Sequence, residues 1–206
     1  MNTCTTIEEL KRFIHASKAK GKRVGFVPTM GFLHRGHTSL FDRARSECDW
    51  LVASIYVNPL QFSPSEDLAS YPTDAEGDAA KCRAHHVDCL FMPESLYESN
   101  HRTRIRVQEL SIGLCGGSRP THFEGVATVV ARLFGLVQPT VAVFGEKDYQ
   151  QLAIIRSMVR DLALPVQIIG GELVRDPDGL ALSSRNTYLS KEQRRRATSI
   201  HRALQA

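Results

Sequence analysis

The sequence predicts an α/β protein built around a doubly wound, mostly parallel sheet. Short apolar runs rich in β-branched residues alternate along the chain with longer runs of helical periodicity. This alternation is typical of strand–helix–strand units, in which helices cover both faces of a parallel sheet. Ligands of such sheets bind at the carboxyl ends of the strands, near the point where the strand order reverses. Polar motifs that directly follow a predicted strand are therefore the first candidates for function.

The first half of the chain is expected to supply three strands and three helices. A helix is predicted over 6–20, where apolar residues recur at helical spacing and Gly21 ends the pattern. The apolar run 51–57 has no polar alternation, which is typical of a strand buried on both faces. The other predicted elements are a strand over 24–27, a helix ending near Cys48, a helix over 74–86 and a strand over 89–92.

In the second half the periodicity is weak at first and then returns. Residues 94–121 predict only short strands or loops, with turns at Gly113 and Gly116. Residues Ser190 to Gln193 have the form of a capping box that opens a final helix. The elements predicted between these parts are a helix over 126–137, a strand over 141–144, a helix over 148–162, a strand over 166–173 and a loop over 181–188.

The composition is that of an ordinary soluble globular protein. The 206 residues are 42% hydrophobic and 23% charged, enough for one core with a short extension. No apolar run approaches the roughly 20 residues of a membrane helix, and the N-terminus lacks a signal-peptide pattern. The five cysteines are odd in number and form no C-x-x-C pair, which argues against a disulfide framework. These features favour a cytoplasmic protein without a membrane partner.

The net charge of +4 is modest and scattered. Basic residues gather in two places, at 101–106 and at Lys191 with 194–196. We interpret both as solvated faces rather than nucleic-acid-binding patches. A small anionic molecule needs only two or three well-placed cations, so we expect small-molecule substrates and no nucleic acid.

A histidine motif follows the strand over 24–27. The chain turns at Gly31 and then carries His34 and His37 into a helix. A helix N-terminus at the carboxyl edge of a sheet favours phosphate through its free N–H groups and its dipole. At positions i and i+3 both histidines can donate to one phosphate chain, and Gly36 lets a nucleotide approach the backbone. Two alternatives are a chance H-x-x-H pair and a zinc site, for which no third ligand lies at metal-like spacing.

Two further motifs follow predicted strands. Gln61 comes after the strand over 51–57 and a proline turn, which presents its amide at the sheet edge. Lys147 and Asp148 follow a later strand, where lysine can reach phosphate oxygens and aspartate can accept from ribose hydroxyls. Gln151 lies one turn on and can face the same cleft. The plainer alternatives are a polar turn residue and an N-capping aspartate beside a solvated lysine.

The loop over 181–188 contains a third motif, L-S-S-R. Ser183, Ser184 and Arg185 offer two hydroxyls and a guanidinium after a glycine-containing turn. Such a loop can act as a mobile clamp that closes on phosphates as their charge shifts. The plainer alternative is a surface turn.

Together these motifs resemble those of a known family. H-x-G-H after a strand and a glycine turn resembles the signature of the HxGH adenylyltransferase superfamily, whose fold is Rossmann-like. The longer string over 28–37, P-T-M-G-F-L-H-R-G-H, resembles the pantothenate synthetase family in particular. The stretches 119–125 and 133–162 resemble the same family, so the resemblance extends over nearly the whole chain.

The resemblance implies an AMP-forming ligase of coenzyme A biosynthesis. The implied reaction condenses (R)-pantoate with β-alanine, using ATP, and gives pantothenate, AMP and diphosphate through a pantoyl adenylate. The implied partners are pantoate, β-alanine and ATP, with Mg²⁺ as the metal. A homodimer is implied as well.

The resemblance also implies roles for individual residues. The implied catalytic residues are His34, His37, Lys147, Ser183 and Arg185. The implied ATP site consists of Met30, Gly31, Phe32, Leu33, His34, Arg35, Gly36, His37, Gly145, Glu146, Lys147, Asp148, Val174, Leu182, Ser183, Ser184 and Arg185. The implied site for pantoate and β-alanine consists of Gln61, Gln151, Pro28, Met30, Phe62, Val129 and Val130. Asp78 is the implied metal ligand.

The chain departs from the family pattern in several places. Thr73 stands where an arginine is usual, an acidic pair is reduced to Gly77 and Asp78, and 100–106 is unlike the usual stretch. Family members also continue into a smaller C-terminal domain that covers the active site. We therefore expect a nucleotide- and pantoate-binding domain over 1–189 and, over 190–206, a helix that leads toward a C-terminal domain that is absent or truncated here.

Two rival functions stay open at this point. A nucleotidyltransferase of the same superfamily would share H-x-G-H but would not need Gln61, Gln151 or the string G-E-K-D-Y-Q-Q. A domain that binds ATP and pantoate with poor turnover is the other, because water in an uncovered site weakens electrostatic contacts and can hydrolyse an acyl adenylate.

Overall fold

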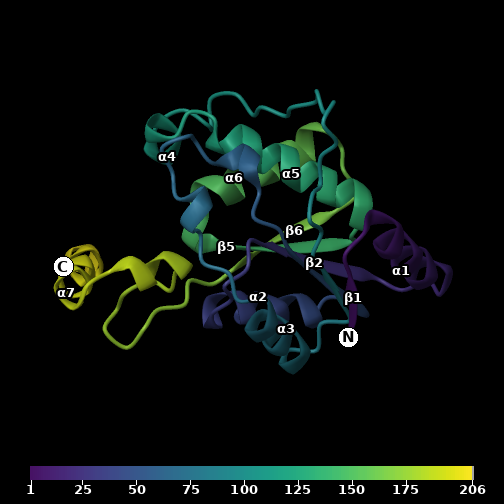
Figure 1. The fold of residues 1–206 in the computed structure, drawn as a ribbon, viewed down its shortest axis with the longest axis horizontal. Helices are drawn as coiled ribbons and strands as arrows, with labels where there is room; N and C mark the ends of the chain where they lie inside the picture. The colour runs from purple at the N-terminus through teal and green to yellow at the C-terminus, as the bar shows by residue number, and fades with distance from the viewer. Residues whose placement is uncertain (206) are drawn as a thin grey trace.

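A parallel sheet forms the centre of the molecule (Figure 1). The computed structural model describes residues 1–205, and within them the sheet has six strands in the order β1-β4-β3-β2-β5-β6. All neighbouring strands pair in parallel, which confirms the predicted fold class. The strands are β1 (Asn2–Cys4), β2 (Val24–Thr29), β3 (Trp50–Ile55), β4 (Cys89–Phe91), β5 (Val141–Gly145) and β6 (Gln167–Gly171).

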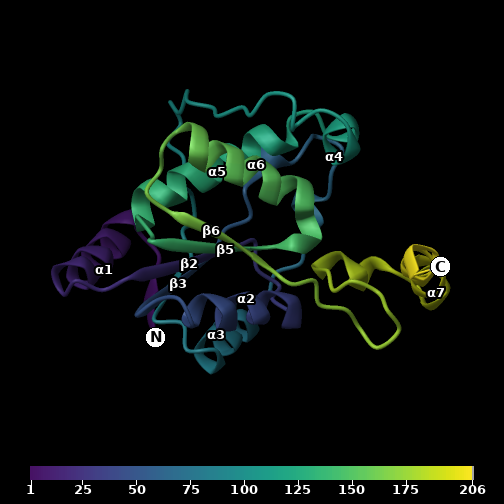
Figure 2. The ribbon, with the colours of Figure 1, turned by 180° about the vertical axis from the view of Figure 1, so that it is seen from behind.

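Helices cover both faces of this sheet, as expected for a doubly wound fold (Figures 1 and 2). Helices α1, α5 and α6 share one hydrophobic core with the sheet, and α2 and α3 share the other. The helices are α1 (Ile7–Ala19), α2 (Arg35–Arg45), α3 (Ala75–Ala84), α4 (Leu114–Ser118), α5 (His122–Val137), α6 (Tyr149–Asp161) and α7 (Lys191–Gln205). Short 3-10 turns occupy η1 (Pro59–Gln61), η2 (Leu68–Ser70), η3 (Glu146–Asp148) and η4 (Ser184–Tyr188).

The central strand β2 shows why the apolar runs have no polar alternation. Successive side chains of a strand point to opposite faces. Phe26 accordingly packs in the core on the α5 side and Val27 in the core on the α2 side, and both side chains are fully buried. Because both faces are covered, both sets of positions have to be apolar.

The strand order reverses between β2 and β5. From β2 the chain builds outward through β3 and β4, and it then returns to the other side of β2 for β5 and β6. The carboxyl ends of β2 and β5 therefore diverge, which opens a crevice at this edge. Pro28 belongs to the end of β2 and Gly145 to the end of β5, so the histidine motif and the Lys147 motif both begin at the reversal.

Strand β1 was not predicted from the sequence. Its three residues have no recognisable periodicity, and only Cys4 among them is buried. The strand forms because the outer edge of β4 offers it partners, with Asn2 opposite Cys89 and Cys4 opposite Phe91. Helix α5 also begins at His122, earlier than the predicted start at Val126.

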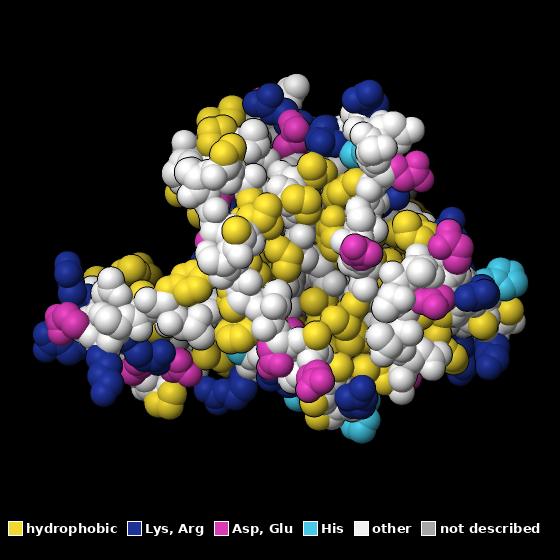
Figure 3. Space-filling view, in the orientation of Figure 1, with side chains coloured by type: hydrophobic (Ala, Val, Ile, Leu, Met, Phe, Trp, Pro, Cys, Tyr) yellow, Lys and Arg dark blue, Asp and Glu magenta, His cyan; other side chains and the backbone are white. Residues whose placement is uncertain are grey.

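The last helix, α7, lies at the end of an arm that extends from the body (Figures 1 and 2). The predicted capping box is present, since Ser190 Oγ accepts from the N–H of Gln193 at 3.2 Å and Gln193 Oε1 accepts from the N–H of Ser190 at 2.8 Å. Hydrophobic side chains gather in the middle of the face drawn in Figure 3, and lysines and arginines lie toward its edges and on this arm. In the described part of the chain no helix has the length and apolar character to cross a membrane.

Candidate active site

A pocket opens at the carboxyl edge of the sheet, where β2 and β5 diverge. Its lining contains most of the residues that the sequence predicts for the site. These are Pro28, Met30, His34, Gly36, His37, Gln61, Val129, Val130, Gly145, Lys147, Asp148, Gln151, Val174, Leu182, Ser183, Ser184 and Arg185. The predicted residues that lie outside this lining are Gly31, Phe32, Leu33, Arg35, Glu146, Phe62 and Asp78.

The two histidines cap the first turn of α2 reciprocally. His34 Nδ1 accepts from the N–H of Gly36 at 3.1 Å, and His37 Nδ1 accepts from the N–H of His34 at 3.3 Å. A neutral imidazole carries its proton on the nitrogen that does not accept, so both rings are Nε2–H tautomers. The ring centroids are 4.0 Å apart. The pocket therefore has two adjacent neutral donors at a helix N-terminus, beyond the backbone N–H groups that the motif predicts.

Burial keeps both imidazoles neutral. Burial and the positive charge of Lys147 lower the pKa of His34 to about 4. Burial, His34 and Lys147 lower the pKa of His37 to about 3. The approach of a nucleotide to the backbone is the predicted reason for glycine at position 36. The structure gives a second reason, because a Cβ at this position would lie 3.0 Å from the His34 ring. A side chain there would require the capping His34 ring to shift by a few tenths of an ångström.

Asp78 holds the turn that precedes α2. Its buried carboxylate accepts from the N–H of Phe32 and from the N–H of Leu33, each at 2.7 Å. Both Gly31 and Phe32 have positive φ, so the turn needs such fixed partners. Asp78 thus contacts the backbone beneath the pocket, and the residues Gly31 to Leu33 shape the pocket without lining it.

Lys147 and Asp148 lie in the 3-10 turn η3, directly after β5. Lys147 Nζ lies 3.2 Å from Asp148 Oδ1. Asp148 makes no capping hydrogen bond to α6, which leaves its carboxylate available to the pocket that it lines. Asp148 therefore occupies the N-cap position of α6 without capping the helix through its side chain. Gln151, in the first turn of α6, lines the same pocket, as predicted.

Asn58, which lies between β3 and η1, sets the orientation of the Gln61 amide. Asn58 Nδ2 donates to Gln61 Oε1 at 3.1 Å, and Gln61 Nε2 donates to Met30 Sδ at 3.2 Å. Asn58 also donates to the carbonyl oxygen of Gly125, at 3.1 Å. A Cβ at Gly125 would lie 2.3 Å from the carbonyl oxygen of Leu60, so only glycine lets α5 approach this loop.

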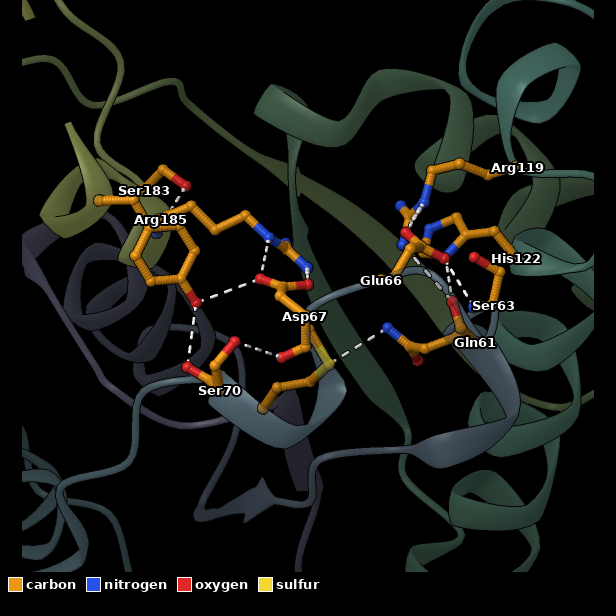
Figure 4. A network of polar contacts seen from close by, with 11 residues as sticks. Gln61, Ser63, Glu66, Asp67, Ser70, Arg119, His122, Ser183 and Arg185 are labelled. Atoms are coloured by element: carbon orange, nitrogen blue, oxygen red, sulfur yellow. Dashed lines mark hydrogen bonds and ion pairs between the residues drawn. The ribbon is translucent and has the colours of Figure 1, made fainter. Parts of the chain in front are cut away.

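Arg119 and His122 hold the backbone of Gln61 from the other side (Figure 4). Nδ1 of His122 donates to the carbonyl oxygen of Gln61 at 2.9 Å, and Nη2 of Arg119 donates to the same oxygen at 3.4 Å. Burial lowers the pKa of His122, so it is neutral. Nε of Arg119 donates to Glu66. Arg119 and His122 both line the pocket.

The loop over 181–188 contacts the rest of the site through Ser184 and Arg185, and Ser183 caps its 3-10 turn. Ser183 Oγ accepts from the N–H of Arg185 at 3.3 Å and begins η4. Ser184 is buried and its Oγ donates to the carbonyl oxygen of Phe32 at 3.1 Å. Arg185 lines the pocket and pairs with Asp67, with two contacts of 2.9 Å. The plain interpretation as a surface turn is therefore wrong.

The metal prediction gains no support from the position of Asp78. Both of its oxygens accept from backbone N–H groups, and Lys81 Nζ lies 3.7 Å from Oδ1. Within residues 1–205, no three His, Cys, Asp or Glu side chains form a group that could hold a metal ion. Asp148 and Glu172 line the pocket and offer carboxylate oxygens. Mg²⁺ is commonly bound by one or two carboxylates together with substrate phosphates, and this lining fits that mode.

Several pocket residues were missed from the sequence. Asn58 and Tyr71 line the pocket, and Glu66 and Asp67 hold two of its arginines. Asn58 stands three residues before Gln61 in the same motif, and an asparagine at the start of a proline turn could have identified it. Glu66 and Asp67 give no such signal, because their partners are far away in the sequence.

Fold and site together define the class of protein. The doubly wound parallel sheet carries neutral donors at a helix N-terminus and cations at the point where its strand order reverses. This is the arrangement of a nucleotide-binding α/β enzyme. The particular family follows from comparison. A model of the pantoate-beta-alanine ligase family matches residues 2–206, and the chain belongs to that family.

Similar proteins and structures agree with this membership. A pantothenate synthetase of Pseudomonas putida strain W619 is 55% identical over 209 residues, which cover 100% of this chain and 73% of that protein. The crystal structure of pantothenate synthetase from Thermus thermophilus matches with a TM-score of 0.95 and 53% identity, over 100% of this chain and 74% of that one. The Francisella tularensis pantoate-beta-alanine ligase, complexed with beta-gamma ATP and β-alanine, matches with a TM-score of 0.94 and 38% identity. The match covers 100% of this chain and 80% of that one.

Proposed function

We propose that this chain has pantoate–β-alanine ligase activity and that the pocket at the β2/β5 reversal carries it. ATP and pantoate react first. A pantoate carboxylate oxygen attacks the α-phosphorus, the bond to the β-phosphate breaks, and pantoyl adenylate and diphosphate form. The observation that carries the proposal is the reciprocal histidine cap, because it supplies two neutral N–H donors where phosphate charge would build up.

The ATP half of the pocket has the residues that this step needs. His34 and His37 would donate to phosphate oxygens through Nε2–H, and Lys147 would add a positive charge near both rings. Ser183 and Arg185 would contact the triphosphate from the loop over 181–188. Asp148 would accept from the ribose. Glu172, together with the substrate phosphates, would hold Mg²⁺, which would neutralise part of the phosphate charge.

The other half of the pocket suits a small hydroxy acid. Val129 and Val130 supply an apolar wall, and Gln61 and Gln151 supply amides that would bind the hydroxyls and carboxylate of pantoate. Asn58 fixes the Gln61 amide, so its Nε2–H groups are already oriented before substrate binds.

The second step needs no covalent intermediate with the protein. The β-alanine nitrogen attacks the acyl carbon of pantoyl adenylate, the bond to the phosphate oxygen breaks, and AMP leaves while the nitrogen loses a proton. Orientation of the two reactants within one pocket supplies much of the acceleration in such a reaction.

Pyrophosphate release tests the first step directly. We expect release from ATP to depend on pantoate and pantothenate to form only when β-alanine is added. Lys147→Ala should abolish pantoate-dependent release and keep the fold, whereas Lys191→Ala on the distant α7 should match the wild type. Release that is independent of pantoate would contradict the proposal, and release of more than one AMP per pantothenate would favour a site that leaks its adenylate to water.

We also propose a cytoplasmic homodimer, with residues 1–189 as the nucleotide- and pantoate-binding unit and α7 leading away from it. All five cysteines are free thiols, which suits a reducing compartment. Leu110, Ile112, Leu114 and Tyr149 are large and exposed, and Gln150 holds the loop before α4 against α6. Such an apolar surface supports a subunit contact. Ile112→Asp should shift the mass measured by analytical ultracentrifugation from dimer to monomer.

A further inference from the structure

Two neighbouring carboxylates lie between the arginines at the mouth of the pocket. Glu66 and Asp67 follow each other in the loop between η1 and η2, and their side chains reach in opposite directions (Figure 4). Glu66 pairs with Arg119, on the side of Gln61. Asp67 pairs with Arg185, on the side of the loop over 181–188. Both arginines line the pocket, whereas neither carboxylate does.

The pair formed by Asp67 and Arg185 is bidentate. Arg185 Nε donates to Asp67 Oδ2 and Arg185 Nη2 donates to Oδ1, each at 2.9 Å. A guanidinium has five N–H donors, and these two contacts use two of them. Among residues 1–205 the remaining donors, on Nη1 and Nη2, have no hydrogen-bond acceptor, so they can bind a phosphate oxygen. Asp67 and a phosphate can therefore bind the same guanidinium together.

Further contacts distinguish this pair from an ordinary surface ion pair. The hydroxyl of Tyr188 donates to Asp67 Oδ2 at 3.1 Å. The Arg185 guanidinium lies 5.3 Å from the ring centroid of Tyr71 and 6.0 Å from that of Phe62. The two aromatic rings and the carboxylate on its edge restrict the plane of the guanidinium as well as its position.

We propose that Asp67 is a positioning residue that holds Arg185 in place for the phosphates of ATP. This inference rests on the proposed function, since it needs Arg185 at the triphosphate. Asp67 acts through Arg185 and does not touch the substrate. Its neighbour Glu66 instead holds Arg119, which donates to the carbonyl oxygen of Gln61.

The test is Asp67→Asn, which keeps the size of the side chain. The amide loses the charge and turns an NH₂ group toward the guanidinium, so the bidentate pair is lost. We expect the Kd for ATP, measured by calorimetry, to rise roughly tenfold. The KM for ATP should rise in parallel, and the KM for β-alanine should stay unchanged. A thermal melt checks that the variant is folded.

A double-mutant cycle separates positioning from a general effect on the loop. If Asp67 acts through Arg185, Asp67→Asn should add nothing in an Arg185→Ala background. Additive effects of the two substitutions would overturn the proposal. Unchanged ATP binding by Asp67→Asn would overturn it as well. Tighter ATP binding would also overturn it, because it would show that Asp67 competes with phosphate for Arg185. Glu66→Gln should leave the Kd for ATP unchanged, and an equal rise there would mean that the whole loop had been disturbed.

The binding measurement also keeps the two proposals apart. Calorimetry needs no turnover, so it tests Asp67 even if the wild-type chain releases no diphosphate with pantoate. That result would contradict the proposed function alone. Normal pantoate-dependent release together with an unchanged Kd for ATP in Asp67→Asn would contradict the role of Asp67 alone.

Discussion

The two regions proposed to bind the phosphates of ATP are held in place in opposite ways. The two histidine rings are fixed by contacts within three residues, from His34 to Gly36 and from His34 to His37, and Asp78 holds only the turn that precedes them. The loop with Arg185 is fixed by contacts to residues 118 and 152 positions away, Asp67 and Phe32. A site can thus combine a part that its own local sequence builds with a part that only the finished fold can orient.

This difference has a consequence for preorganisation. The histidine donors belong to a helix that packs on the sheet, so they are in place whenever the helix is. The Arg185 side chain is 41% exposed, and it keeps its place through a few long-range contacts. We therefore expect changes in the turn to affect catalysis or folding strongly and changes in the loop to affect ATP affinity by smaller factors.

The largest effect is expected from His37→Ala. Loss of one positioned donor at a developing phosphate charge should lower kcat for pantoate-dependent diphosphate release by about 10²- to 10³-fold. Circular dichroism should show an unchanged fold. His85→Ala is the matched control, because His85 is outside the pocket and pairs with Asp42 on the surface. A wild-type rate for His37→Ala would remove the histidine turn from the mechanism.

The next effect is on stability and concerns the support of the turn. Asp78→Ala leaves the N–H groups of Phe32 and Leu33 without partners, which should lower the free energy of unfolding by about 3 kcal/mol. Urea denaturation without Mg²⁺ measures this, and Asp42→Ala on the exposed side of α2 serves as control. If Asp78 is mainly a metal ligand, the loss will be seen only when Mg²⁺ and ATP are present.

A smaller effect is expected from pH. Both histidines have a folded pKa, about 4 and about 3, below the unfolded value of about 6.5. Their contribution to stability is therefore complete above pH 6.5 and is lost as the pH falls toward those values, because a proton on Nδ1 would face a backbone N–H. Since the pocket is open to water, we expect a loss of about 2 kcal/mol for the pair between pH 7.5 and pH 5.

Urea titrations at the two pH values measure this loss. The double variant His34→Asn/His37→Asn removes both titrating groups and keeps a side chain that can cap a helix. It should lose about 2 kcal/mol less than the wild type over the same range. An equal loss in both proteins would assign the pH dependence to other groups.

The smallest effect concerns the hydrogen bond that joins the two regions. Ser184→Ala removes the donor to the carbonyl oxygen of Phe32, at a cost of about 1 kcal/mol. If the loop over 181–188 depends on this contact, the KM for ATP should rise roughly fivefold while the KM for β-alanine stays constant. Ser199→Ala on α7 is the control. An unchanged KM would show that Asp67 alone suffices to hold the loop.

Local signals explain how much of this molecule could be predicted from its sequence. The buried strand β3 follows from an unbroken apolar run, helix α1 follows from hydrophobic periodicity, and the capping box before α7 follows from residues three apart. The prediction that the histidine motif lies at the ligand site follows from the rule that ligands bind where the strand order reverses. All of these depend on neighbours in the chain or on a general property of parallel sheets.

The features that were missed depend on partners brought together by the fold. Strand β1 exists because β4 has a free edge, and Asp67 matters because Arg185 arrives beside it. Asp78 is a further example, since nothing near it in the sequence shows that its carboxylate lies under the turn at Phe32. The resemblance to a family names the residues implied for ATP along the chain but could not say which of them line the pocket.

The reciprocal histidine cap also determines which ions the pocket avoids. A transition metal binds the lone pair of an imidazole nitrogen. In both rings the Nδ1 lone pair accepts a backbone N–H, and Nε2 carries the proton. Ligation through Nε2 would move that proton to Nδ1, where it would oppose the N–H of the cap. A metal ion on either Nε2 would therefore cost the cap one of its two backbone hydrogen bonds.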